Sequence, residues 1–447
     1  MALLDKHSCE CTRSELDLFT IPGTQTSIES SNYVKIYPQT TLDRSGPIDF
    51  KITSGQYIDP ASTILFLETR ILDKDGNALK DKTADDDPAI PDESICAPIN
   101  YFHNTQFKNV EVYLNQKLVS VSDNCYSYRS FLETLLTFDE GVKRESLACS
   151  LWFKDTGDPD EHEHVAGADR NKGFISRFNV SKFSQTFQSW GRIHSELFSQ
   201  SKLLLPNTEL RLRFLKNDEK FSLMSKVENH NYRIVTDQAY LLVRQCTISD
   251  SVSVSHQLAL LKENAKYPIN KVKTSFYVKG PGRSDLSVPN LVSGTLPDRI
   301  VVCLVKSKAF SGSHFHNPFN MCHFNARHIV LRKDGNPVPF ESIKLDFTNN
   351  RYLEGYLSLI QGTGRLYSDS SFNIRPYTDY KNGYTIYSFD ITPDQTPTSG
   401  DINLIRDGKL NLEIQLAENT DESVTLIVVS SYTDKIEIDK DGVVYYD

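Results

Sequence analysis

The sequence has no long apolar run and no cluster of basic residues. Its longest uninterrupted apolar run extends from Ile300 to Val305, far short of the roughly 20 residues that a membrane-spanning helix needs. No run of Lys or Arg exceeds two residues, and the formal net charge is −9. A protein that binds nucleic acid through its phosphates normally shows a basic stripe. These absences predict no membrane span and no specific recognition of a nucleic-acid sequence.

Cysteine is also scarce. The chain has eight cysteines without the spacing of a disulfide framework, and Cys9 and Cys11 form the only close pair. This usage predicts reduced, mostly buried thiols in an intracellular protein. The first residues contain no apolar segment of signal-peptide length, so we expect no secretory leader. The glycosylation pattern Asn179-Val-Ser181 is then an accidental match.

Motifs of known catalysts are missing as well. The sequence has neither the Gly-x-Ser-x-Gly turn of a hydrolase nucleophile nor the Gly-x-x-x-x-Gly-Lys phosphate loop. The glycine-rich segment 361–364 follows a predicted helix instead of opening one, which favours a loop. A Ser/His/Asp set assembled from distant residues is left open. We predict no catalytic residue and no enzymatic activity.

Two segments carry residue types that bind zinc or act as bases. His314 and His316, followed by Cys322 and His323, are suitable ligands, but their spacing matches no standard structural zinc pattern. We interpret them as polar positions on a strand or loop. The second segment, His162-Glu-His164, lies in a polar loop that we interpret as solvated surface. Its acidic neighbours are Asp155, Asp158 and Asp160.

One segment resembles the start of a calcium loop. In Asp73-Lys-Asp-Gly-Asn77, however, Gly76 is one place early, and Ala84 stands where a bidentate Glu is required. We therefore predict a turn. For the whole chain we predict no metal and no cofactor.

Aromatic residues are plentiful and indicate the fold class. The chain has 24 Phe and 21 Tyr among 447 residues, a length too great for one hydrophobic core. Aromatic and β-branched residues favour strands. Residues 48–52 alternate between apolar and polar, and Asp-Gly or Asn-Gly turns recur near residues 76, 335, 383 and 442. Short helices are predicted at 128–138, 192–204, 257–261 and 351–360.

Three segments of the first half are echoed in the second. Segment 129–133 is echoed by 351–354, segment 107–114 by 324–331, and segment 209–214 by 409–414. The order is the same and the offsets are similar, which indicates two similar domains in tandem. We predict an all-β chain of two tandem jelly-roll domains, each an eight-stranded β-sandwich with short helices in its loops. The predicted parts are an N-terminal arm (1–40), a first jelly roll (41–250), a linker (251–267) and a second jelly roll (268–447).

Several longer segments share a pattern with one protein family. They are Phe102-His-Asn104 through Leu114-Asn115, Arg192-Ile-His194 through Leu210-Arg-Leu212, Asn382-Gly-Tyr384 through Pro393-Asp394, Asn403-Leu-Ile405-Arg-Asp-Gly408, and Tyr432-Thr-Asp434 through Ile438-Asp439. Together these segments, which span roughly residues 100 to 440, resemble the major capsid proteins of Polinton/Maverick elements and adintoviruses. The acidic loop 80–98 and the loop 155–169 have no counterpart in the family.

The resemblance implies a double jelly-roll major capsid protein. In that family, three chains form a trimer of six jelly rolls, and such pseudo-hexameric trimers tile an icosahedral shell around double-stranded DNA. The implied partners are further copies of the chain, neighbouring trimers, a penton protein and minor capsid proteins. The implied location is the virion capsid, assembled inside the host cell. A packaging ATPase and a maturation protease accompany the family.

Other functions are compatible with the residues alone. A carbohydrate- or receptor-binding β-sandwich would be a monomer or small oligomer with an exposed aromatic platform. A hydrolase on the same scaffold would need carboxylates or histidines converging in one cleft. A capsid gene fixed in a host genome and reused would have the same sequence features as a viral one.

Overall fold

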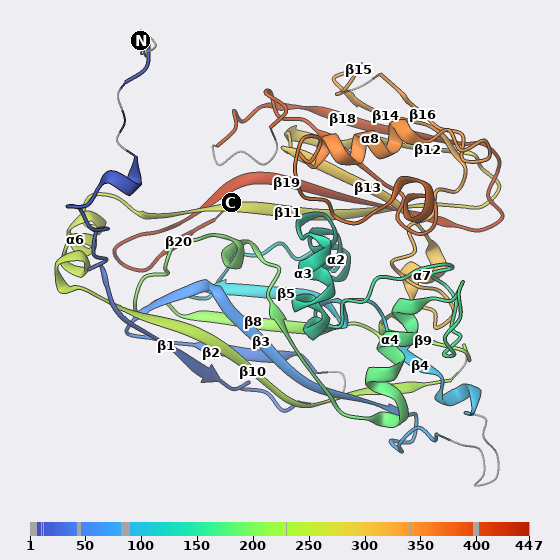
Figure 1. Ribbon diagram of the computed structural model, residues 1–447, viewed down its shortest axis with the longest axis horizontal. Helices are drawn as coiled ribbons and strands as arrows, with labels where there is room; N and C mark the ends of the chain where they lie inside the picture. Colours follow the sequence, from blue (N-terminus) through green and yellow to red (C-terminus); the bar gives the residue numbers. More distant parts are fainter. Residues whose placement is uncertain are drawn as a thin grey trace.

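The computed structural model describes residues 7–9, 11, 13–42, 46–81, 90–228, 230–339, 341–396 and 402–446. Within these residues, the chain forms two β-sandwiches, each made of two antiparallel sheets (Figure 1). The all-β prediction with two jelly rolls is confirmed. The central residues of the acidic loop, including Ala84, lie outside the described part.

In the first jelly roll, the sheets alternate buried and exposed side chains, as two-layer packing requires. One sheet has the order β1 (Ile28–Ile36), β10 (Tyr232–Ile248), β3 (Tyr57–Asp73) and β7 (Phe187–Arg192). The facing sheet has the order β2 (Ile48–Ile52), β8 (Leu210–Lys216), β5 (Phe107–Leu114) and β6 (Lys117–Leu118).

The second jelly roll repeats this arrangement strand for strand. One sheet has the order β11 (Ala265–Lys279), β19 (Val424–Ile438), β13 (Arg299–Lys306) and β17 (Ile386–Asp390). The other has the order β12 (Asp285–Thr295), β18 (Asp407–Leu416), β14 (Ala326–Lys333) and β15 (Asn336–Pro337). Two short strands, β16 (Ile343–Lys344) and β20 (Val444–Tyr445), add to β14 and β19. Among the eight main strands of each jelly roll, the first pairs with the last, and the second with the second-last.

The echoed sequence segments occupy equivalent strands. Segments 107–114 and 324–331 belong to β5 and to the start of β14, and segments 209–214 and 409–414 belong to β8 and β18. Each pair of strands is hydrogen-bonded, but the registers differ by two residues. Leu114 faces Leu210 in the first jelly roll, whereas Leu331 faces Leu412 in the second. The echo therefore marks equivalent strands, although its alignment differs from their pairing register by two residues.

The helices lie in the loops. The predicted helices at 128–138 and 351–360 correspond to α2 (Tyr126–Thr137) and α8 (Leu353–Gly362), which follow the equivalent hairpins β5–β6 and β14–β15. The others are α1 (Phe102–Thr105), α3 (Glu140–Arg144), α4 (Lys172–Ser181), α5 (Glu219–Ser222), α6 (Asp250–Leu260) and α7 (Ser307–Ser311). A small separate sheet pairs β4 (Cys96–Pro98) with β9 (Leu223–Ser225). No helix in the described part is long and apolar enough to cross a membrane.

Several local predictions were wrong. Segment 192–204 holds only a short 3-10 turn at Glu196–Ser199, because β7 continues to Arg192 and the following apolar residues are buried without helical spacing. The turn at 381–384 follows a π-helical turn, Pro376–Tyr380, and Tyr384 bridges Met321 instead of closing a hairpin. The predicted turns at 73–77 and 439–442 are present.

The predicted irregular arm needs a correction too. Residues 28–36 form β1, an edge strand paired along its length with β10, and Val34 and Ile36 alternate with exposed neighbours. At the other junction, α6 occupies most of the predicted linker, and β11 begins at Ala265. The division into an arm, two domains and a linker at the stated residues remains a proposal.

The four large sheets are stacked in one series. Figure 1 shows the β1-containing sheet at one end, then the sheet of β2, β8 and β5, then α2 against the β11-containing sheet, and finally the sheet of β12, β18 and β14. The jelly rolls therefore pack head to tail. A single hydrophobic cluster runs through their junction, where the rings of Phe131 from α2 and Phe319 stack 4.1 Å apart.

Candidate functional site

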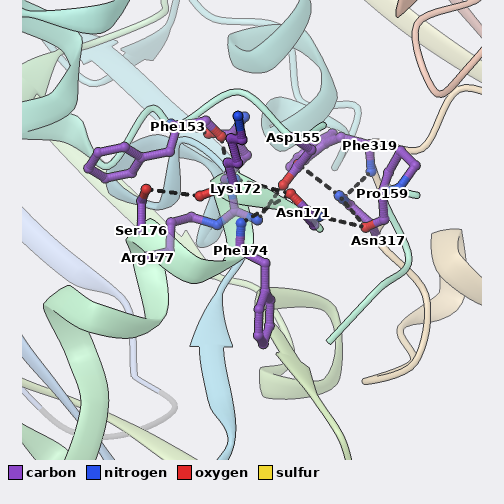
Figure 2. Close-up of polar contacts among 12 residues, drawn as sticks. Phe153, Asp155, Pro159, Asn171, Lys172, Phe174, Ser176, Arg177, Asn317 and Phe319 are labelled. Atoms are coloured by element: carbon purple, nitrogen blue, oxygen red, sulfur yellow. Dashed lines mark hydrogen bonds and ion pairs between the residues drawn. The ribbon is translucent and has the colours of Figure 1, made fainter. Parts of the chain in front are cut away.

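The junction between the two jelly rolls is built around a buried arginine. Arg177 of α4 is fully buried, and its guanidinium donates to three acceptors. Nε donates to Pro98 O (2.8 Å), Nη1 to Phe153 O (2.9 Å) and Nη2 to Asp155 Oδ1 (2.7 Å) (Figure 2). A buried charge is tolerated only when it is paired and hydrogen-bonded, and these bonds meet both conditions.

Asp155 carries the connection into the second jelly roll. Its second oxygen, Oδ2, accepts a hydrogen bond of 2.9 Å from the side-chain amide of Asn317. Figure 2 shows Asn317 reaching this carboxylate from the opposite side to Arg177. The same amide donates to Pro159 O (3.3 Å), and the hydroxyl of Tyr384 donates to Asp155 O (3.3 Å). The ion pair of the first jelly roll is thus completed by side chains of the second.

The start of α4 fixes the position of Arg177. Asn171 caps this helix, since its Oδ1 accepts from the backbone N–H groups of Gly173 (3.1 Å) and Phe174 (3.2 Å). Gly173 is required by space, because a Cβ there would lie 2.7 Å from Asp155 Oδ1 and from Phe153 O. The helix can therefore approach the Asp155 loop closely enough for the Arg177 bonds to form.

A second buried ion cluster lies beside α2. Arg129 donates from Nη1 to Glu196 Oε1 (2.6 Å) and from Nε to Glu133 Oε1 (3.0 Å). His194 Nδ1 contacts Glu133 Oε2 at 2.7 Å. Burial would raise the pKa of Glu133, but Arg129 and His194 hold it well below its usual range. Glu196 also accepts from the backbone N–H of Val272 (3.5 Å), so this cluster too reaches the second jelly roll.

Further hydrogen bonds join the two jelly rolls around these clusters. They are Lys154 Nζ to Asp379 Oδ2 (2.6 Å), Lys143 Nζ to Phe372 O (3.0 Å), Arg365 Nη1 to Asp139 Oδ1 (3.0 Å), Asn115 Nδ2 to Gly442 O (2.7 Å) and Lys306 Nζ to Asp160 Oδ2 (3.1 Å). Together with the continuous core, these bonds tie the two jelly rolls together at one joint.

The two histidine segments considered as metal or base candidates come together at this joint. His162 Nε2 lies 3.0 Å from the carbonyl oxygen of His314, and His314 Nδ1 lies 3.1 Å from Leu223 O. Both nitrogens must donate to these carbonyls, so neither is free to bind a metal. Burial lowers the pKa of both histidines, which favours the neutral form. His316 instead faces Asp160 Oδ2 at 3.4 Å.

The other members of these segments are placed apart from the histidine contacts. Burial raises the pKa of the Cys322 thiol to about 12, and its sulfur contacts Asn320. Burial and the nearby Lys381 lower the pKa of His323 to about 4, and its ring stacks on Phe347. His164 contacts Glu163. Across the described residues, no group of three or more His, Cys, Asp or Glu side chains is arranged to hold a metal ion.

Sequence reasoning missed the residues that matter most at the joint. Asp155 was considered only as part of a surface loop, but its side chain is buried, and Arg177, Asn171 and Asn317 were not considered. Only Asn171, directly before an apolar segment, gives a recognisable helix-cap signal.

Acid should destabilise the chain partly through His103. Its ring is fully buried, Nδ1 lies 3.0 Å from Ser189 Oγ, and Nε2 has no partner among the described residues. Burial and the nearby His194 lower the pKa of His103 to about 3. Between pH 6.5 and 3, the unfolded chain therefore binds a proton that the folded chain does not. The contribution of His103 to the free energy of unfolding is complete above pH 6.5. As the pH decreases below 6.5, this contribution falls by about 1.4 kcal/mol per pH unit.

The change His103→Asn should remove this contribution to the pH slope. Urea unfolding at pH 7.5, 6 and 5 measures it, and His328→Asn on the exposed side of β14 is the matched control. We expect a shallower slope for His103→Asn and the wild-type slope for the control. Equal slopes in all three proteins would show that His103 is not buried in its neutral form.

Comparison with known proteins places this geometry in context. No family model matches the sequence. The chain is 25% identical over 424 residues to an uncharacterized protein of Caenorhabditis elegans, F54H12.2, covering 93% of this chain and 96% of the relative.

Solved capsid structures have the same fold. The Sputnik virophage structure solved by cryo-EM superposes with a TM-score of 0.63 at 11% identity, covering 99% of this chain and 94% of that one. For the PBCV-1 virus capsid, the TM-score is 0.58 at 9% identity, with coverages of 96% and 99%. For the mavirus major capsid protein, it is 0.56 at 11% identity, with coverages of 100% and 95%. The chain therefore has the double jelly-roll fold that these viral capsid structures share.

Proposed function

We propose that this chain is a major capsid protein of the Polinton/Maverick and adintovirus type. Three copies form a pseudo-hexameric trimer, and such trimers tile an icosahedral shell around a double-stranded DNA genome. The observation that carries the proposal is the duplication of one jelly roll, strand for strand, in a chain similar over nearly its full length to viral capsid structures.

The physical properties of the chain suit this role. Closed threefold symmetry provides three identical contacts, and two similar domains per chain let a trimer fill a site with six neighbours. The joint around Arg177 and Arg129 would hold the two jelly rolls at a fixed angle, which a regular lattice requires. A net charge of −9 suits a shell subunit better than a protein that grips DNA.

The remaining assignments follow from the same proposal. The partners are neighbouring trimers, a penton protein and minor capsid proteins, and the location is the virion capsid, assembled inside the host cell. The chain acts as a structural protein and not as an enzyme. The relative in an animal, Caenorhabditis elegans, favours an element carried in a host genome.

Negative-stain microscopy of the purified chain tests the proposal. We expect particles with a hexagonal outline and, at high protein concentration or altered salt, closed shells or flat hexagonal arrays. Compact particles without threefold symmetry under all these conditions would contradict it.

One observation favours the alternative of a carbohydrate-binding module. The outer face of the β1-containing sheet carries a row of partly exposed aromatic side chains, in which Trp190 pairs with Phe66 and Phe66 with Tyr240. Aromatic platforms of this kind can stack on sugar rings. Titration with oligosaccharides, monitored by tryptophan fluorescence, distinguishes the two functions. A carbohydrate-binding module would give a saturable change in fluorescence, whereas we expect none from a capsid protein.

A further inference from the structure

The packing of α2 within the chain provides a template for a contact between chains. Leu132 and Leu136 of α2 are buried and line a cavity of about 160 Å³ together with Val301 of β13 and Val429 of β19. Val301 and Val429 are register neighbours on the face of their sheet that points away from the second sandwich core. A helix of the first jelly roll thus covers the outer face of the first sheet of the second.

In the described part of the chain, the equivalent helix of the second jelly roll, α8, leaves the matching leucines exposed. The echo that aligns Leu132 with Leu353 also aligns Leu136 with Leu357, since both pairs are 221 residues apart. Leu353 and Leu357 are 46% and 43% exposed, and with the half-buried Ile360 they form a stripe at helical spacing. The opposite face of α8 is buried against β17, where Gly355 and Gly362 permit close approach. Among the described residues, the stripe of α8 therefore lacks the partner that α2 has.

In the structure of the described residues, the outer face of the equivalent sheet of the first jelly roll also exposes large apolar side chains. Leu65 and Leu67 of β3 point into the sandwich core, so Ile64 and Phe66 point outward. Phe66 stacks on Tyr240 at 4.5 Å, and the neighbouring Trp190 is 44% exposed. An outer sheet face that carries such a row is characteristic of a protein interaction surface.

We propose that α8 of one chain packs its Leu353–Leu357 stripe on the Phe66–Trp190–Tyr240 row of a second copy of this chain. The inference rests on the proposed function and names the two surfaces that build the trimer. The contact repeats between chains the arrangement that α2 makes within the chain. The two surfaces differ from each other, so the chains associate head to tail. The association closes into a ring of three chains if each jelly roll is rotated by a sixth of a circle relative to the one before.

The two surfaces lie at opposite ends of the molecule, so they can meet only between two copies of this chain. Figure 1 shows α8 beside the last sheets of the stack and β1, β3 and β10 at the other end. Charge also matches: Glu354 lies next to the stripe on α8, while the Lys35 ammonium lies 4.7 Å over the ring of Tyr240 in the aromatic row.

Charge substitution on either surface tests the contact. Leu357→Glu and Trp190→Glu place a carboxylate in the proposed apolar interface, whereas Leu258→Glu is the matched control on α6, where Leu258 is 57% exposed. Light scattering measures the mass. We expect both interface variants to need at least about tenfold more protein than wild type to form trimers, and the control to match wild type. Circular dichroism checks that each variant is folded.

Cross-linking provides a test that does not depend on disrupting the protein. Leu357→Cys and Trp190→Cys are purified separately, in a background with the exposed Cys9, Cys11 and Cys149 changed to Ser, and are then mixed and oxidised. We expect a disulfide-linked dimer in the mixture and none in either variant alone. This result requires that the two surfaces meet between chains.

The outcomes of these experiments distinguish a failure of the proposed interface from a failure of the proposed function. A wild-type trimer that persists in both Glu variants, without cross-linking in the Cys mixture, would overturn the interface and leave the capsid proposal standing. A wild-type chain that is monomeric at all concentrations would contradict both. A monomer whose Trp190 fluorescence saturates with oligosaccharide would assign the aromatic row to sugar binding instead.

Discussion

Replacing Arg177 with Met should lower the free energy of unfolding by about 3–5 kcal/mol, because it leaves a buried carboxylate without its cation. Asp155 is 4% exposed, and its other partner, Asn317, cannot neutralise the charge. The Pro98 and Phe153 carbonyls would also lose their donor. Urea unfolding at pH 7 measures the effect.

Two further variants make this prediction specific. Arg170→Met removes an ion pair with Glu161 at an exposed arginine, and we expect little change in stability. The double variant Arg177→Met with Asp155→Asn should be less destabilised than the sum of the single changes, because the unpaired charge is gone. Additive effects would mean that Arg177 and Asp155 do not act as a pair.

The change Gly362→Ala should lower the free energy of unfolding by about 1–3 kcal/mol, despite the higher helix propensity of alanine. A Cβ at this position would lie 2.5 Å from Ser388 O and 2.6 Å from its carbonyl carbon. Backbone atoms of a strand that is hydrogen-bonded into a β-sheet cannot rotate away, so α8 must move from β17. The displacement would also shift the Leu353–Leu357 stripe, and we expect weaker trimer formation.

Gly141→Ala is the control for this change. Gly141 lies in the short helix α3, and an added Cβ would have no neighbour within 4 Å. Alanine should be neutral there or raise stability by up to about 1 kcal/mol. Equal thermal stabilities for Gly362→Ala and wild type would show that α8 is not held against β17 as closely as described.

The general architecture could be predicted because it depends on local pattern. Alternation along 48–52 and the Asp-Gly turns identified strands and hairpins, and the echoes of β5 and β8 identified the duplication. Strand β12 escaped prediction because Pro289 and Asn290 interrupt its period at a register shift between Val288 and Val292. The alternation, turns and echoes that indicated two domains therefore could not place every strand.

The joint could not be predicted because its contacts come from distant segments. Asn317 lies 162 residues from Asp155, and no local pattern marks Arg177 as buried, since arginine in a helix is usually exposed. The histidine segments were recognised as unusual, but their role depends on carbonyl oxygens supplied by the fold. The sequence identified histidines that could bind a metal or act as bases. Their packing in the fold makes them hydrogen-bond donors to backbone carbonyl groups instead.

Light scattering after size-exclusion chromatography of the purified full chain tests the capsid proposal most directly. The double jelly-roll architecture and the complementary uncovered surfaces predict a mass near three times 50.8 kDa. A mass of 50.8 kDa that persists at high protein concentration and across salt conditions would contradict the assignment as a self-assembling shell subunit.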